Sequence, residues 1–241
     1  PEPERPFAEE TGAEPGVLHI AWHAKPFNGC ECHADCRAAV EDAAKLCAEL
    51  GHRVEHVEWG VDVERLNRAV RIIVGANTRR TVDDRLKQLG RDTLNDGDLE
   101  PLTRGVYDGG ARYGAADYVF ALNAIHACSR AVAGFFQKFD LMLTPTLGVP
   151  PQKLGGALSM SYPDRKAFGK SVAETVGFTQ FFNVTGTPAI SLPLYWNSAG
   201  LPIGAQFAAA YGQEALLIRL AAQLGRARPW GQRRPVLIQS V

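Results

Sequence analysis

The amino-acid sequence predicts an α/β fold, and three observations support this prediction. Residues 17–59 carry a strand pattern, a helix pattern and a second strand pattern in succession. The short apolar segment 139–144 has the composition of a strand covered on both faces of a sheet. Residues 189–196 and 201–210 read as two strands joined by a turn, and a helix with an apolar stripe follows them. We therefore expect these segments to belong to one α/β unit.

The opening elements follow from residue type and spacing. Residues 16–24 are rich in Val, Leu, Ile and Trp, which favours a strand. We expect the next helix to be capped by Asp35 and to stop at Gly51. Residues 52–59 then predict a second strand, and residues 62–90 are mostly helical in pattern.

A long helix is expected from about residue 115 to residue 138. Its predicted buried stripe consists of Tyr118, Leu122, Ile125, Val132 and Phe136. Segments 139–144 and 188–195 are expected to be central strands of the sheet. Between them, the stretch TGTP predicts a tight turn in which Gly186 takes an unusual backbone angle. The turn NSAG then joins the last two strands.

Composition excludes several classes of partner. Lys plus Arg equals Asp plus Glu at 26 each, so no net charge favours nucleic acid or an anionic membrane. No apolar run has the length of a membrane helix and no signal segment opens the chain, so we expect a cytoplasmic protein. Residues 1–16 read as a linker and residue 1 is Pro, so the chain is expected to be a piece of a longer protein.

A cluster of thiols near the start of the chain does not predict a metal site. Cys30, Cys32, His33 and Cys36 lie close in sequence, but they lack the C-x-x-C pair of a zinc site and no second pair follows. Cys47 falls on an apolar helical stripe, where a small buried side chain is the simpler interpretation. We expect no metal and no cofactor.

Four motifs resemble the C-terminal part of the amidase signature family in order and spacing. They are FDLMLTPT, GFTQFFNVTGTPAISLPL, GLPIGAQF and EALLIRLAAQLGRARPW. Further segments, among them RPFAEE and GAADYVFALNAIH, resemble the branch that includes bacterial aryl- or alkyl-amidases and 6-aminohexanoate cyclic dimer hydrolases. The resemblance implies the C-terminal part of an α/β/α layered fold with a mixed central sheet. Residues 17–241 would be this part of a single domain whose N-terminal catalytic part is absent.

The resemblance implies hydrolysis of linear or cyclic carboxylic amides by a Ser-Ser-Lys triad. In that mechanism one serine attacks the carbonyl, a second relays a proton and a neutral lysine is the base. The triad of the family lies in a Gly- and Ser-rich segment upstream of everything present here, so we expect no catalytic residue in this chain. Ser159 and Ser161 are the nearest approach to a serine pair, with Lys166 and Lys170 behind them, and we interpret them as loop residues.

The resemblance assigns this chain to the wall of the substrate pocket. Val176, Gly177, Phe178 and Thr179 are the expected pocket residues, and the apolar character of 176–182 favours uncharged alkyl or aryl amides. The expected partners are a small-molecule amide and the missing N-terminal half of the same protein. The sequence does not determine whether the protein forms a homodimer.

Two alternatives to a hydrolase stay open. The first is a non-catalytic binding or scaffold subunit. The second is an amidotransferase A-type subunit, which is disfavoured because Val176 stands where such subunits hold the substrate ammonium with an acidic side chain.

Overall fold

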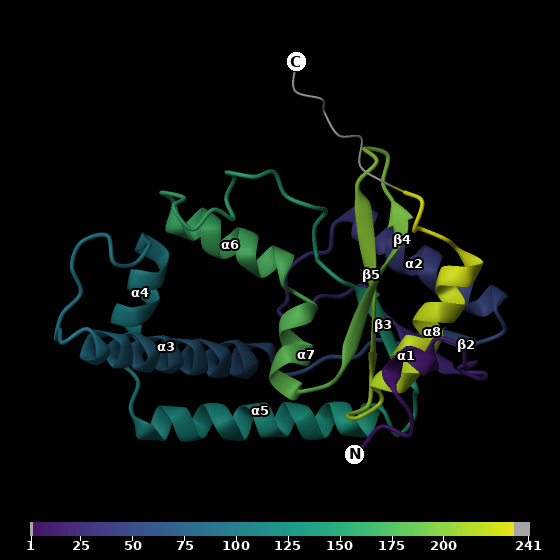
Figure 1. The fold of residues 1–241 in the computed structure, drawn as a ribbon, viewed down its shortest axis with the longest axis horizontal. Helices are drawn as coiled ribbons and strands as arrows, with labels where there is room; N and C mark the ends of the chain where they lie inside the picture. The colour runs from purple at the N-terminus through teal and green to yellow at the C-terminus, as the bar shows by residue number, and fades with distance from the viewer. Residues whose placement is uncertain (1, 234–241) are drawn as a thin grey trace.

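The computed structural model describes residues 2–233, whose ribbon is shown in Figure 1. The helices of this part of the chain are α1 (Phe7–Glu10), α2 (Ala34–Glu49), α3 (Val63–Gln88), α4 (Pro101–Gly110), α5 (Ala115–Phe135), α6 (Arg165–Thr175), α7 (Thr179–Thr185) and α8 (Glu214–Ala227). The strands are β1 (His19–Trp22), β2 (Arg53–His56), β3 (Leu141–Pro145), β4 (Ala189–Trp196) and β5 (Pro202–Ala209). None of the described helices combines the length and the apolar character that crossing a membrane requires.

The strands form one mixed sheet in the order β2-β1-β3-β5-β4. β1 runs parallel to β2 and β3, whereas β5 runs antiparallel to β3 and β4. β4 and β5 form the predicted hairpin, in whose turn Gly200 adopts a φ of 75°. Gly186 likewise adopts a φ of 71°, and it ends α7 directly before β4. The predicted α/β fold with a mixed sheet is confirmed.

β3 lies in the middle of the sheet, as its apolar sequence predicts. All its residues are buried, and Leu141 and Leu143 have no accessible surface. β4, by contrast, is an edge strand within residues 2–233, and its Ala189 and Ser191 are exposed. The prediction that 188–195 is a central strand is therefore wrong for this chain. Apolar composition indicates that the faces of a strand are covered, but it does not reveal how many strand neighbours it has.

Helices cover both faces of the sheet and make three layers (Figure 1). On one face, Ile20, Leu143 and Phe207 belong to a core that α2 and α8 complete. On the other face, Met142 and Ala208 pack with apolar side chains from α3, α5 and α7. Successive strand residues point to opposite faces, so one strand can supply both cores.

α3 extends beyond the sheet and forms a helical arm with α4 and the first half of α5 (Figure 1). Ala69 and Ile72 of α3 pack against Ala121 and Ala124 of α5. α3 and α4 approach each other closely in the arm, where a Cβ atom on Gly110 would collide with the carbonyl oxygen of Gly75.

The predicted buried stripe of α5 is only partly correct. Val132 is buried, but Tyr118 and Leu122 are 39% and 37% exposed. The first half of α5 contacts α3 through small side chains such as Ala121 and Ala124, whereas its second half packs under the sheet. A search for large apolar residues on one face therefore misses the alanines that let two helices approach closely.

The segment expected to be a linker contains α1, which packs against α8. Glu10 at the end of α1 is only 1% exposed, and Arg219 of α8 donates from Nε to its carboxylate at 2.5 Å. Arg5 lies 3.3 Å from the other carboxylate oxygen. The hydrogen bond from Arg219 lowers the pKa of Glu10, so the carboxylate stays ionised and paired.

Replacing Gly110 with Ala should lower the free energy of unfolding by about 1–3 kcal/mol, because the added methyl group must push α3 and α4 apart. Urea denaturation measures the change. Gly134→Ala is the matched control, since an added Cβ there meets no atom within 4 Å. The control should stabilise the protein by up to about 1 kcal/mol, because Ala is the better helix former. Equal effects of the two substitutions would show that α3 and α4 do not meet at these glycines.

Candidate functional site

The parallel strands β2, β1 and β3 have their carboxyl ends on the same side of the sheet. Ligands of α/β proteins usually bind beside these carboxyl ends. The loop after β3 begins at this end of the sheet and is fixed by backbone hydrogen bonds. The N–H of His33 donates to the Gly148 carbonyl at 2.8 Å, and the N–H of Gly148 donates to the Thr175 carbonyl at 3.2 Å. A side chain on Gly148 would collide with the carbonyl oxygen of Glu174. The end of α6 is therefore held against the loops that follow β1 and β3.

The four sequence-predicted pocket residues form the junction between α6 and α7, but they face different surroundings. Val176 ends α6 and is half-buried, and Thr179 begins α7. Gly177 is packed against the loop after β1, where its carbonyl accepts from the N–H of Phe27 at 2.9 Å. Phe178 is fully buried, with its ring 6.2 Å from that of Phe27. Val176 alone of the four lines a hollow described for residues 2–233.

This hollow lies between α3 and α6 and has a volume of about 230 Å³. Figure 1 shows α3 and α6 on opposite sides, with α7 near the ends of both. The residues that line the hollow are Asn28, Asn67, Val70, Arg71, Gly169, Val172, Ala173, Val176 and Gln180. We call this set of residues the α3–α6 hollow.

Most polar side chains of the α3–α6 hollow are free to bind a ligand. Asn28 is the exception, because its Nδ2 donates to the Ala173 carbonyl at 2.6 Å and its Oδ1 accepts from the Cys30 N–H. The side chains of Asn67, Arg71 and Gln180 make no hydrogen bond or ion pair within residues 2–233. The hollow thus carries a positive charge that the sequence analysis did not foresee.

Sequence reasoning missed Asn67 and Arg71 because they lie about a hundred positions before the pocket motif. A signal for them was nevertheless present. The two residues are four positions apart on a long helix, so they share one face of it with Val70 between them.

Ser159 and Ser161 lie in the loop after β3, as expected, with 3.0 Å between their hydroxyl oxygens. Lys166 and Lys170 are exposed on α6, and Lys170 pairs with Glu174 at 3.6 Å. No serine hydroxyl in the described part of the chain is hydrogen-bonded to a lysine. An exposed, paired lysine lacks the burial that would make it a base.

The thiol-rich segment has a structural role at the start of α2. His33 caps this helix in place of the predicted Asp35, because its Nδ1 accepts from the Asp35 N–H at 3.1 Å. Burial raises the pKa of Cys32 to about 11 and that of Cys36 to about 12, so both thiols are protonated at neutral pH. Among residues 2–233, no three His, Cys, Asp or Glu side chains are close enough to hold a metal ion.

His23, directly after β1, is an unusual buried group. It is 2% exposed, and neither ring nitrogen has a hydrogen-bond partner within residues 2–233. The rings of Phe27 and Phe178 lie 5.1 Å and 6.4 Å from it. Burial lowers the pKa of His23 to about 4, although the Lys25 backbone favours the protonated form. The imidazole is therefore neutral at physiological pH.

The mixed α/β sheet of this chain is also present in a solved amide hydrolase. The model of the Amidase family matches residues 1–218, so the chain belongs to this family. It is 32% identical to a putative amidase AmiC of Mycobacterium leprae over 217 residues. This match covers 84% of this chain and 42% of the relative. It is 29% identical over 245 residues to a 6-aminohexanoate-cyclic-dimer hydrolase of Paenarthrobacter ureafaciens, covering 99% of this chain and 50% of the relative.

Solved structures agree with the family assignment. A 6-aminohexanoate cyclic dimer hydrolase superposes with a TM-score of 0.85 at 28% identity, over 98% of this chain and 50% of that chain. A bacterial aryl acylamidase superposes with a TM-score of 0.77 at 20% identity, which shows the fold alone. The chain thus spans about half the length of the amidases it matches.

Replacing His23 with Phe should remove a loss of stability that the wild type suffers in acid. As the pH falls below 6.5, the unfolded chain binds a proton that the folded protein does not accept until about pH 4. The folded state should therefore lose up to about 3 kcal/mol over this range. Urea denaturation at about pH 7 and about pH 4.5 should show a smaller loss for His23→Phe than for wild type. The same loss in both proteins would mean that the imidazole can take up a proton in the folded state.

Proposed function

We propose that this chain is the C-terminal part of a hydrolase that cleaves linear or cyclic carboxylic amides. The observation that carries this proposal is the family match over residues 1–218, combined with coverage of only about half of each amidase relative. One of these relatives bears the name 6-aminohexanoate-cyclic-dimer hydrolase. The reaction would add water across the C–N bond and release a carboxylic acid and an amine.

We assign the Ser-Ser-Lys triad to an upstream part of the protein. A lysine acts as a base near neutral pH only when its surroundings depress its pKa. Lys166 and Lys170 are exposed on α6 and do not meet this requirement. Ser159 and Ser161 bond to each other in a loop and have no base beside them.

In this proposal the junction between α6 and α7 forms a wall of the substrate pocket. Val176 presents its apolar side chain to the α3–α6 hollow. Gly177 and Phe178 fix its position, because one is bonded to the loop after β1 and the other is buried against the Phe27 ring. Thr179 starts α7 and sets the direction in which the chain leaves the wall.

The proposed partner, apart from the amide, is the upstream part of the same protein. β4 has no strand neighbour on its outer side among the described strands, so its outward backbone groups can pair with another strand. A second copy of the chain could use the same edge, and a homodimer is the alternative. We also propose a cytoplasmic location, which the five free cysteines support.

An amidotransferase A-type subunit fits the α3–α6 hollow less well than a hydrolase does. Such a subunit needs an acidic side chain where Val176 stands, and Arg71 in the same hollow would repel an ammonium group. A scaffold subunit without activity is distinguished from a hydrolase by assay.

Residues 1–241 alone should not hydrolyse short aliphatic or aryl amides, whereas the same chain extended by its upstream part should. The reason is that nucleophile, relay and base act as a unit, and a pocket wall cannot replace them. Release of the amine measures the reaction. Ser159→Ala combined with Ser161→Ala in the extended protein is the control and should leave the activity unchanged. Turnover by the short chain that Ser159→Ala abolishes would contradict the proposal, and an inactive extended protein would favour the scaffold alternative.

A further inference from the structure

The α3–α6 hollow combines an apolar floor with free polar groups that come from separate helices. Val70, Val172 and Val176 supply the apolar surface. Asn67 and Arg71 project from α3, and Gln180 projects from α7. A hollow of this kind, mostly apolar with a few convergent polar groups, is the usual form of a small-molecule site.

Arg71 differs from several cations of the helical arm. Three of them have carboxylate partners: Arg68 with Asp117, Arg79 with Asp83, and Arg80 with Asp84. Arg65 has no carboxylate partner among the described residues, but its guanidinium lies over the Phe120 ring at 5.8 Å. Arg71 has no carboxylate partner within residues 2–233. Glu174 of the facing helix α6 is paired with Lys170 at 3.6 Å. The guanidinium of Arg71 is therefore left for a ligand.

The chemistry of these groups favours an anion with two acceptor oxygens. A guanidinium donates two parallel hydrogen bonds to a carboxylate, a geometry that ammonium and neutral amides do not match. Asn67 lies one helical turn before Arg71 on the same face, so its amide can donate to the same group. The valines can meanwhile cover the methylene chain or ring that carries the carboxylate.

We propose that the α3–α6 hollow binds a carboxylate carried by the substrate. The substrate class is then an amide with a remote carboxylate on its acyl or its amine side, rather than a fully uncharged amide. Arg71 is the residue that determines this specificity. The inference rests on the proposed amide hydrolysis and adds to it which amides are preferred.

The test compares matched pairs of amides in the full-length protein that carries this chain. The first pair is glutaryl-4-nitroanilide, which carries a carboxylate on the acyl side, and pentanoyl-4-nitroanilide, which does not. The second pair is 4-acetamidobenzoate and 4-acetamidotoluene, which differ on the amine side. The wild type should have a higher kcat/KM for the carboxylate-bearing member of at least one pair. Arg71→Ala should reduce this kcat/KM ratio by about tenfold or more, mainly by raising the KM of the carboxylate-bearing member.

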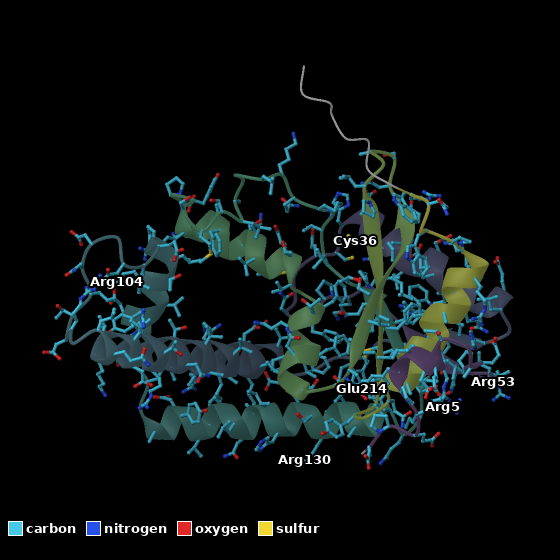
Figure 2. The ribbon with its side chains drawn as sticks, viewed as in Figure 1. Arg5, Cys36, Arg53, Arg104, Arg130 and Glu214 are labelled. Atoms are coloured by element: carbon cyan, nitrogen blue, oxygen red, sulfur yellow. The ribbon has the colours of Figure 1, made fainter. Side chains whose placement is uncertain are left out.

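Three further variants make the result specific. Arg71→Lys keeps the charge without the planar fork and should keep part of the preference. Val176→Asp places a carboxylate in the hollow beside Arg71 and should abolish the preference for the carboxylate-bearing member of each pair. Arg130→Ala removes an exposed cation from the outer face of α5 (Figure 2). It should leave the kcat/KM of all four substrates unchanged.

Two outcomes would overturn the inference while amide hydrolysis stands. One is an unchanged preference in Arg71→Ala. The other is an equal loss of activity on both members of a pair, together with a lower melting temperature, which would mean that Arg71 pairs with the upstream part instead. If the full-length protein hydrolyses no amide, the proposed function fails. The carboxylate site is then tested by calorimetry, which measures the dissociation constants of hexanoate and hexanamide. Hexanoate should bind more tightly than hexanamide, and Arg71→Ala should remove this difference.

Discussion

β3 joins the parallel half of the sheet to its antiparallel half, and the rest of the structure depends on this double pairing. The strand bonds to β1 on one side and to β5 on the other. Leu141 and Leu143 face the helices α2 and α8, whereas Met142 faces α5 and α7. Because both faces and both edges of β3 are occupied, the direction in which the chain leaves it is fixed. The following loop is bonded through Gly148 to α2 and to the end of α6, so β3 sets the place of the candidate site.

The α3–α6 hollow owes its shape to the way α3 is anchored. Leu66 and Ala69 are buried against the core and the arm, which leaves Asn67 and Arg71 to flank the buried stripe. On the other side, Phe178 fixes the junction after α6 among aromatic rings. The polar groups of the hollow are thus positioned by apolar packing, while the groups themselves remain unpaired. Binding a ligand would therefore break no hydrogen bond or ion pair that Asn67, Arg71 or Gln180 makes within residues 2–233, although ordering the exposed Arg71 side chain would cost conformational entropy.

The sequence predicted those elements whose signals are local. β3 was found because a short apolar run has few other interpretations, and the β4–β5 hairpin because Gly200 marks its turn. The edge position of β4 could not be predicted, because strand neighbours depend on contacts far along the chain. Helices α4 and α6 were missed because both are short, with 10 and 11 residues, and each has a glycine in its interior. Arg71 was missed because a charged helix residue is usually a solvated one, and only the three-dimensional fold brings it to Val176.

The central claim is that the sheet described here is completed at β4 by an upstream part of the protein. Hydrogen–deuterium exchange of residues 189–196 tests this claim most directly. In residues 1–241 alone, the β4 amides that point away from β5 should exchange rapidly, because an unpaired edge does not protect them. In the extended protein these amides should become protected, while those of β3 are protected in both. Equally rapid exchange of the outward β4 amides in the two proteins would contradict the account.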